Sequence, residues 1–169
     1  CISVERVYVE EPVHDEFLDR VTGKVEALRQ GPPGAAGSVD VGAIIFPPQI
    51  ELIEAHVRDA VAKGARVVTG GSRAEAGNGR FFEPTVLADV APSALMAREE
   101  TFGPVAPLFR FTTEEEAIAQ ANATEFGLVA YFYGRDIGRV WRVAEGLESG
   151  MVGINTGLIS TEVAPFGGV

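Results

Sequence analysis

The chain contains one cysteine, Cys1, and a thiol is the side chain in this sequence best suited to covalent catalysis. A thiolate is a soft, strong nucleophile that can attack a carbonyl carbon and form a covalent intermediate. The neighbouring sequence fixes no basic partner for this thiol, and a cysteine at the start of a strand can equally be a small buried hydrophobic residue. A cysteine at the first position could also serve an N-terminal-nucleophile hydrolase, whose base is its own α-amino group. Cys1 alone therefore leaves three interpretations open.

Other residue types that support catalysis or ligand binding are sparse. The two histidines, His14 and His56, lie far apart, and neither has a second ligand at the spacing of a zinc or iron site. The G-P-P-G stretch at residues 31–34 is a loop without the glycine spacing of a phosphate-binding motif. We therefore expect no metal site, and any cysteine chemistry must involve Cys1.

The composition is that of a globular chain, with 169 residues, 46% hydrophobic residues and a mean hydropathy of +0.14. The net charge of −10 argues against a nucleic-acid partner, which would require clustered Lys and Arg. No apolar run approaches the roughly 20 residues of a membrane helix, so we expect no membrane association. A single cysteine permits no internal disulfide, which fits a cytoplasmic location.

Strand-like and helix-like segments alternate along the chain. Apolar patterning predicts strands over residues 2–9, 65–69, 81–90, 105–111, 128–133 and 151–155. Helical spacing and capping residues predict helices over residues 12–30, 48–64, 113–121 and 136–147. This alternation predicts an α/β fold, with an open, twisted, mainly parallel sheet and helices on both faces, in one domain over residues 1–169. It disfavours an N-terminal-nucleophile hydrolase, which needs two stacked antiparallel sheets between helices.

Three motifs give the chain a specific resemblance. They are E-E-T-F-G-P-V at residues 99–105, P-F-G-G at residues 165–168, and C-I-S at residues 1–3 followed by a strand. In their order along the chain, these motifs resemble the catalytic domain of aldehyde dehydrogenases, starting at the nucleophilic cysteine. Segments of the downstream half are similar to succinate-semialdehyde dehydrogenases, namely 107–111, 124–128 and 152–160.

The resemblance implies a role for five residues. Cys1 would attack the aldehyde to give a thiohemiacetal and then a thioester. The Glu100 carboxylate, a double acceptor, would hold the nicotinamide ribose hydroxyls, and Phe102 would pack beside the nicotinamide. Ser160 would bind the distal carboxylate of the semialdehyde, and Phe166 would line the aldehyde tunnel. The plain alternatives are a charged turn followed by a core phenylalanine, and a solvated loop serine.

The resemblance also implies cofactor, partners and extent. The coenzyme is NAD or NADP, bound mainly by a domain outside this chain, and the substrate is a small aldehyde. The parent enzyme is expected to be a homo-oligomer, a dimer or a tetramer. Residues 1–169 would be a partial catalytic domain without the coenzyme domain and C-terminal tail, and inactive by themselves. The alternatives are an aldehyde dehydrogenase of another specificity and a non-catalytic fragment.

Overall fold

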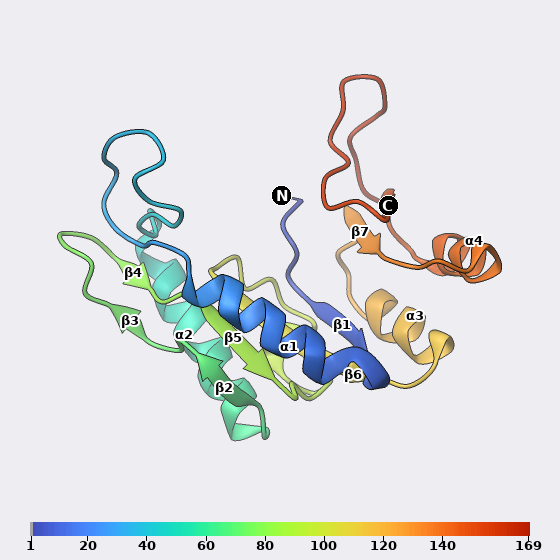
Figure 1. The fold of residues 1–169 in the computed structure, drawn as a ribbon, viewed down its shortest axis with the longest axis horizontal. Helices are drawn as coiled ribbons and strands as arrows, with labels where there is room; N and C mark the ends of the chain where they lie inside the picture. The colour runs from blue at the N-terminus through green and yellow to red at the C-terminus, as the bar shows by residue number, and fades with distance from the viewer. Residues whose placement is uncertain (1) are drawn as a thin grey trace. The chain divides into compact units, whose positions relative to one another are not determined.

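The computed structural model describes residues 2–169, and these residues form two compact units. The sheet unit is Val4–Phe111, and the C-terminal unit is Thr112–Val169 together with the residues before Val4. Figure 1 shows the elements of both units. Cys1, the predicted nucleophile, lies outside the described residues.

The sheet unit is built on a four-stranded sheet of order β1-β6-β5-β2. Both pairs that include the central strand β6 are parallel, whereas β2 pairs with β5 in the antiparallel direction. The strands are β1 (Val7–Glu10), β2 (Arg66–Thr69), β5 (Thr85–Ala88) and β6 (Val105–Phe111). The predicted open, mainly parallel sheet is therefore confirmed, with β2 as an antiparallel edge strand.

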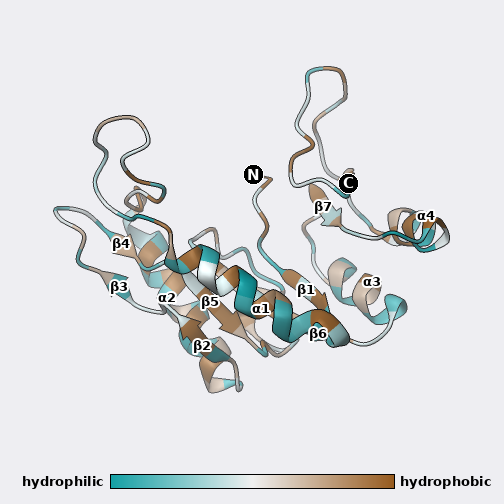
Figure 2. Ribbon diagram, viewed as in Figure 1, coloured by the Kyte–Doolittle hydropathy of each residue, from teal (hydrophilic) through white to brown (hydrophobic). Residues whose placement is uncertain are grey.

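Successive side chains of a strand point to opposite faces of the sheet, so apolar residues lie on both faces. One helix covers each face. On one face, Leu18 of α1 (Glu11–Glu26) shares a buried cluster with Val86 and Leu108. On the other face, α2 (Pro47–Ala62) buries its apolar stripe against Leu87 and Phe109. In Figure 2, β5 is mainly hydrophobic and α1 carries bands of both kinds. The predicted placement of helices on both faces is confirmed.

The first predicted strand and the first predicted helix are both shorter than expected. The strand predicted over residues 2–9 begins only at Val7, where its pairing with β6 begins. Before it, the side chains of Glu5 and Arg6 bond to distant backbone groups at residues 97–102. The helix predicted over residues 12–30 ends at Glu26. Beyond it, the backbone and side chain of Arg29 bond to Asp40 instead of continuing the helix.

The extended segment predicted over residues 81–90 is two strands. Pro84 interrupts it, so that β4 (Phe81–Phe82) pairs with β3 (Arg73–Ala74), while β5 joins the main sheet. The stretch at residues 72–79, for which we predicted neither strand nor helix, therefore contains a short strand. A 3₁₀ turn that the sequence pattern did not indicate, η1 (Leu95–Ala97), precedes β6.

The C-terminal unit contains α3 (Glu114–Asn122), β7 (Val129–Phe132), α4 (Ile137–Gly146) and β8 (Met151–Ile154). The strands β7 and β8 pair in parallel, and α4 forms the connection between them. The predicted N-caps are confirmed, since Thr113 accepts from the Glu116 N–H and Asp136 from the Arg139 N–H. This unit thus repeats the strand–helix–strand pattern on a smaller scale.

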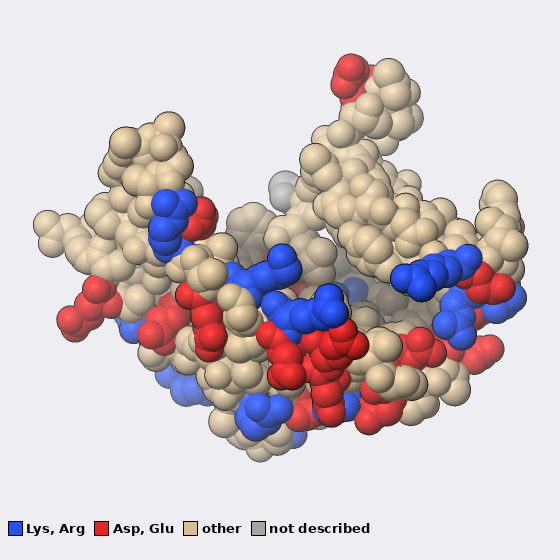
Figure 3. Space-filling view, in the orientation of Figure 1, with Lys and Arg blue, Asp and Glu red and all other residues tan. Residues whose placement is uncertain are grey.

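Arg110, near the end of β6, is the centre of an ion-pair cluster in the sheet unit. Its guanidinium group bonds to the carboxylates of Asp89, Asp15 and Glu11. These carboxylates raise the pKa of Arg110, with Asp89 having the largest effect. On the face shown in Figure 3, basic side chains lie beside acidic ones, as such ion pairs require. Within residues 2–169, no helix is long and apolar enough to cross a bilayer.

Candidate active site

The segment between η1 and β6 presents two of the predicted functional side chains to solvent. Glu100 is exposed and the Phe102 side chain is 54% exposed, whereas Thr101 between them is only 3% exposed. In a short loop whose exposed residues flank a buried one, the buried residue anchors the loop to the rest of the unit. We call residues 99–103 the cofactor loop, after the role that the sequence analysis predicts for Glu100 and Phe102.

Thr101 is bonded through each of its polar groups. Its carbonyl oxygen accepts from Gln49 Nε2 at 2.7 Å, and its N–H donates to Glu5 Oε2 at 3.1 Å. Its hydroxyl lies 3.0 Å from Nδ1 of the buried His56. The other ring nitrogen of His56 lies 3.3 Å from Glu99 Oε2, so Nε2 donates to this carboxylate. In the neutral ring, Nδ1 then accepts from the Thr101 hydroxyl.

Phe102 adopts an unusual backbone conformation, with φ of 44°. An aromatic residue in the left-handed region costs on the order of 1–3 kcal/mol, so the surroundings must hold it there. The Phe102 N–H donates to Glu5 Oε2 at 3.1 Å. The next residue, Gly103, packs against buried Ile53, whose Cδ1 would lie only 2.5 Å from any Cβ at that position. The Phe102 ring is therefore presented by a constrained turn.

The start of η1 is tied to α2 by a carboxylate. Asp59 accepts from the Leu95 N–H at 2.7 Å and pairs with Lys63 at 2.7 Å. These contacts lower the pKa of the Asp59 carboxyl, with the Lys63 hydrogen bond having the largest effect. Lys63 also donates to the Ser93 carbonyl at 2.8 Å. The segment leading into the cofactor loop is thus fixed to the same helix as the loop itself.

Glu100 and Phe102 fit a nicotinamide nucleoside in their chemistry. Among the residues that the structure describes, the Glu100 carboxylate has no hydrogen-bond or ion-pair partner, so both of its oxygens can accept from a diol. The exposed Phe102 ring offers an apolar face to a flat heterocycle. No group of three or more His, Cys, Asp or Glu in residues 2–169 is arranged to hold a metal ion.

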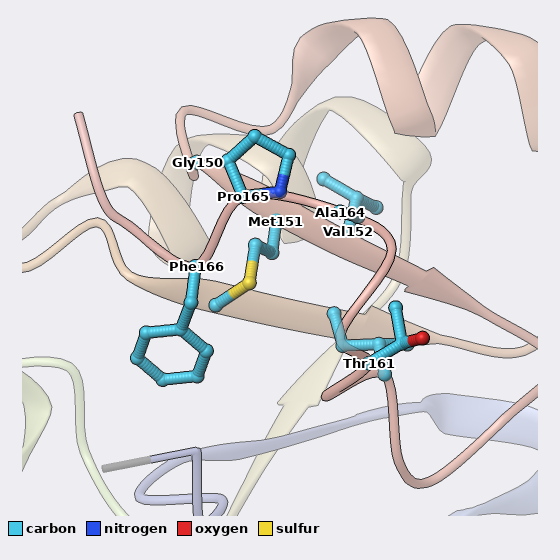
Figure 4. A pocket seen from close by; sticks show the side chains of 8 residues that line it. Gly150, Met151, Val152, Thr161, Ala164, Pro165 and Phe166 are labelled. Carbon is cyan, nitrogen blue, oxygen red and sulfur yellow. The ribbon is translucent and has the colours of Figure 1, made fainter.

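A pocket in the C-terminal unit contains the predicted residue Phe166. The pocket has a volume of about 390 Å³ and is lined mainly by apolar side chains from β8 and the segment after it. Figure 4 shows the Met151 side chain extending toward the Phe166 ring. Ser160 is exposed and lies in the chain between two lining residues, Ile159 and Thr161, but does not itself line the pocket.

Glycines bring the P-F-G-G segment against β8 and so position Phe166. A Cβ on Gly150 would collide with the Gly167 carbonyl oxygen. A Cβ on Gly168 would lie 3.1 Å from the carbonyl oxygen of Gly127, which also accepts from the N–H groups of Gly150 and Val169. Close backbone approach explains the glycines at positions 150 and 168.

The structure brings the predicted residues together in two pairs. Glu100 and Phe102 share the cofactor loop, and Ser160 and Phe166 share the loop after β8. The sequence analysis missed the loop's anchors Glu5, Gln49 and His56. No signal in the sequence indicated these anchors, because the burial of Thr101 is known only from the structure.

Comparisons with known proteins agree with this fold. The model of the aldehyde dehydrogenase family matches residues 1–169. The chain is 53% identical to glutarate-semialdehyde dehydrogenase of Pseudomonas aeruginosa and 53% identical to succinate-semialdehyde dehydrogenase [NADP(+)] of Escherichia coli, in each case over all of the chain and 35% of the relative. The crystal structure of succinate-semialdehyde dehydrogenase from Burkholderia pseudomallei superposes with a TM-score of 0.95 at 56% identity, covering 100% of this chain and 35% of that one.

The chain belongs to the aldehyde dehydrogenase family. It spans about a third of the length of the curated relatives that it matches.

Proposed function

We propose that this chain carries the nucleophile and part of the coenzyme and substrate sites of an NAD(P)-dependent aldehyde dehydrogenase. The observation that carries the proposal is the cofactor loop, in which Glu100 and Phe102 are exposed while Thr101 is locked beneath them. A loop that is rigid in its backbone and open in its side chains is suited to bind a ligand. Family membership supplies the reaction class.

Cys1 performs the covalent chemistry in this proposal. Its thiolate adds to the aldehyde carbon to give a thiohemiacetal, and loss of hydride from that carbon leaves a thioester. The bound nicotinamide dinucleotide supplies the hydride acceptor. Water then cleaves the thioester to release the carboxylate and restore the thiol. Glu100 holds the nicotinamide ribose, and Phe102 limits where the ring lies.

The proposed substrate is succinate semialdehyde. Two relatives are named for semialdehydes that bear a distal carboxylate, and both are 53% identical to this chain. Phe166 and the apolar pocket of the C-terminal unit accommodate the carbon chain, and the exposed Ser160 hydroxyl donates to the carboxylate. A family member with another aldehyde specificity is the alternative.

The remaining parts of the proposal concern the whole enzyme. Residues 1–169 form part of its catalytic domain, and NAD or NADP is bound mainly by residues outside this chain. The enzyme is a homo-oligomer, a dimer or a tetramer. It works in the cytoplasm, where a chain with one cysteine needs no disulfide. The 169 residues alone are expected to be inactive, because most of the dinucleotide site is elsewhere.

Substrate preference tests the proposed specificity. We expect the full-length enzyme to use succinate semialdehyde with a kcat/KM about 10²-fold higher than an uncharged aldehyde of the same length, because a site built for a carboxylate leaves polar groups unpaired without one. Ser160→Ala should narrow this ratio by lowering kcat/KM for the semialdehyde alone. Ser38→Ala, at an exposed serine in the sheet unit, is the matched control. Equal kcat/KM for both aldehydes in the wild type would contradict the assignment.

A further inference from the structure

One carboxylate oxygen holds two consecutive backbone N–H groups of the cofactor loop. Glu5 Oε2 accepts from the N–H of Thr101 and from the N–H of Phe102, at 3.1 Å in both cases. Hydrogen bonds to an ionised acceptor are roughly twice as strong as neutral ones. Glu5 is partly buried, which strengthens them further by limiting access of water.

These two bonds fix the peptide planes that orient the exposed side chains. The Thr101 N–H belongs to the plane that follows Glu100, and the Phe102 N–H belongs to the plane that precedes Phe102. Phe102 sits at φ of 44°, where an aromatic residue does not remain without support. Glu5 therefore acts on the backbone at the points that decide where the Glu100 carboxylate and the Phe102 ring lie.

The other anchors of the loop act differently. Gln49 and His56 both belong to α2, and they hold the carbonyl oxygen and the hydroxyl of Thr101. Of these three anchors, Glu5 alone bonds to the Phe102 backbone and comes from another part of the chain, four positions after Cys1. The Glu5 carboxylate thus joins the segment that follows the nucleophile to the loop that faces the coenzyme.

We propose that Glu5 is a positioning residue for hydride transfer: it holds the backbone of Thr101 and Phe102 so that the Glu100 carboxylate and the Phe102 ring keep the geometry that binds the nicotinamide nucleoside. This inference rests on the proposed function, because it assumes that the loop binds the coenzyme. Glu5 itself touches neither substrate nor coenzyme in this proposal.

Hydrogen–deuterium exchange tests the backbone contact without any ligand. In the full-length protein, Glu5→Ala should increase exchange in peptides that cover Thr101 and Phe102 by about 10-fold or more, because both amides lose their acceptor. Glu5→Gln retains an acceptor oxygen and should stay near the wild-type rate. Exchange in β6 should be unchanged if the sheet remains folded. Unchanged exchange of the loop in Glu5→Ala would overturn the proposal.

Kinetics separate positioning from a purely structural role. Glu5→Ala should raise KM for the dinucleotide about 10-fold and lower kcat, because a misplaced nicotinamide slows hydride transfer. The kinetic isotope effect measured with an aldehyde deuterated at its carbonyl carbon should therefore increase. Glu5→Gln should restore most of both parameters. Glu26→Ala, at an exposed glutamate at the end of α1, should match the wild type. A lower kcat with unchanged KM and isotope effect would mean only a loss of folded enzyme and would overturn the proposal.

The wild-type enzyme distinguishes failure of this inference from failure of the proposed function. If the wild type oxidises no aldehyde, the proposed function fails, while titration of the same variants with NAD and NADP still tests Glu5. Weaker binding by Glu5→Ala, restored in Glu5→Gln, would then support positioning of the loop. Equal binding by all three proteins would overturn it.

Discussion

Replacing Cys1 with serine is expected to reduce aldehyde oxidation by the full-length enzyme at least about 10³-fold, because an unactivated hydroxyl is a far weaker nucleophile than a thiolate at neutral pH. Residues 1–169 contain no second cysteine that could take over. Initial rates of NAD(P)H formation at saturating aldehyde would measure the effect.

Two controls identify the loss as chemical. Dinucleotide affinity of Cys1→Ser should remain at the wild-type value, because Glu100, Phe102 and the anchors of their loop are unchanged. Ser3→Ala, at an exposed residue two positions further on, should keep the wild-type rate within about twofold. Turnover by Cys1→Ser at more than a tenth of the wild-type rate would show that Cys1 is not the nucleophile.

Phe109→Ala is expected to cause the largest loss of stability that we predict in the sheet unit. Phe109 lies on the central strand β6, is 1% exposed, and packs with its ring centroid 5.2 Å from that of Tyr8. Removing a buried phenylalanine costs about 3–5 kcal/mol through lost burial and the cavity left behind. The midpoint of urea unfolding, followed by circular dichroism, should fall by about 1–2 M.

Phe17→Ala is the matched control for this substitution. The Phe17 side chain on α1 is 40% exposed, so its removal leaves no closed cavity and should shift the midpoint by a small fraction of that amount. Equal shifts for the two variants would contradict the position of Phe109 in the core between β6 and α2.

Local signals in the sequence predicted much of the fold. The N-caps Thr113 and Asp136 act within three residues of themselves, so their role could be recognised from spacing alone. The apolar run of β6 was predicted with its observed bounds, Val105–Phe111, because a strand buried on both faces has a continuous hydrophobic pattern. The alternation of strands and helices was sufficient to predict the class of sheet.

Long-range contacts account for the features of the fold and the loop that the sequence did not predict. Glu5, which was predicted to lie within the first strand, precedes it and bonds to residues that lie 96 and 97 positions away, and no local pattern encodes such a contact. The motif at residues 99–105 located the cofactor loop but not its anchors, since Gln49 and His56 are 52 and 45 positions from Thr101. The left-handed backbone of Phe102 is equally unexpected, because aromatic residues avoid it without tertiary support.

The central claim is that Cys1 forms the covalent intermediate of aldehyde oxidation. Mass spectrometry of the full-length enzyme, quenched in acid during turnover of succinate semialdehyde, tests this claim most directly. We predict that the peptide containing Cys1 gains the mass of one succinyl group and loses it on treatment with hydroxylamine, as a thioester does. A succinyl group found on another residue, with Cys1 unmodified while the product accumulates, would contradict the account.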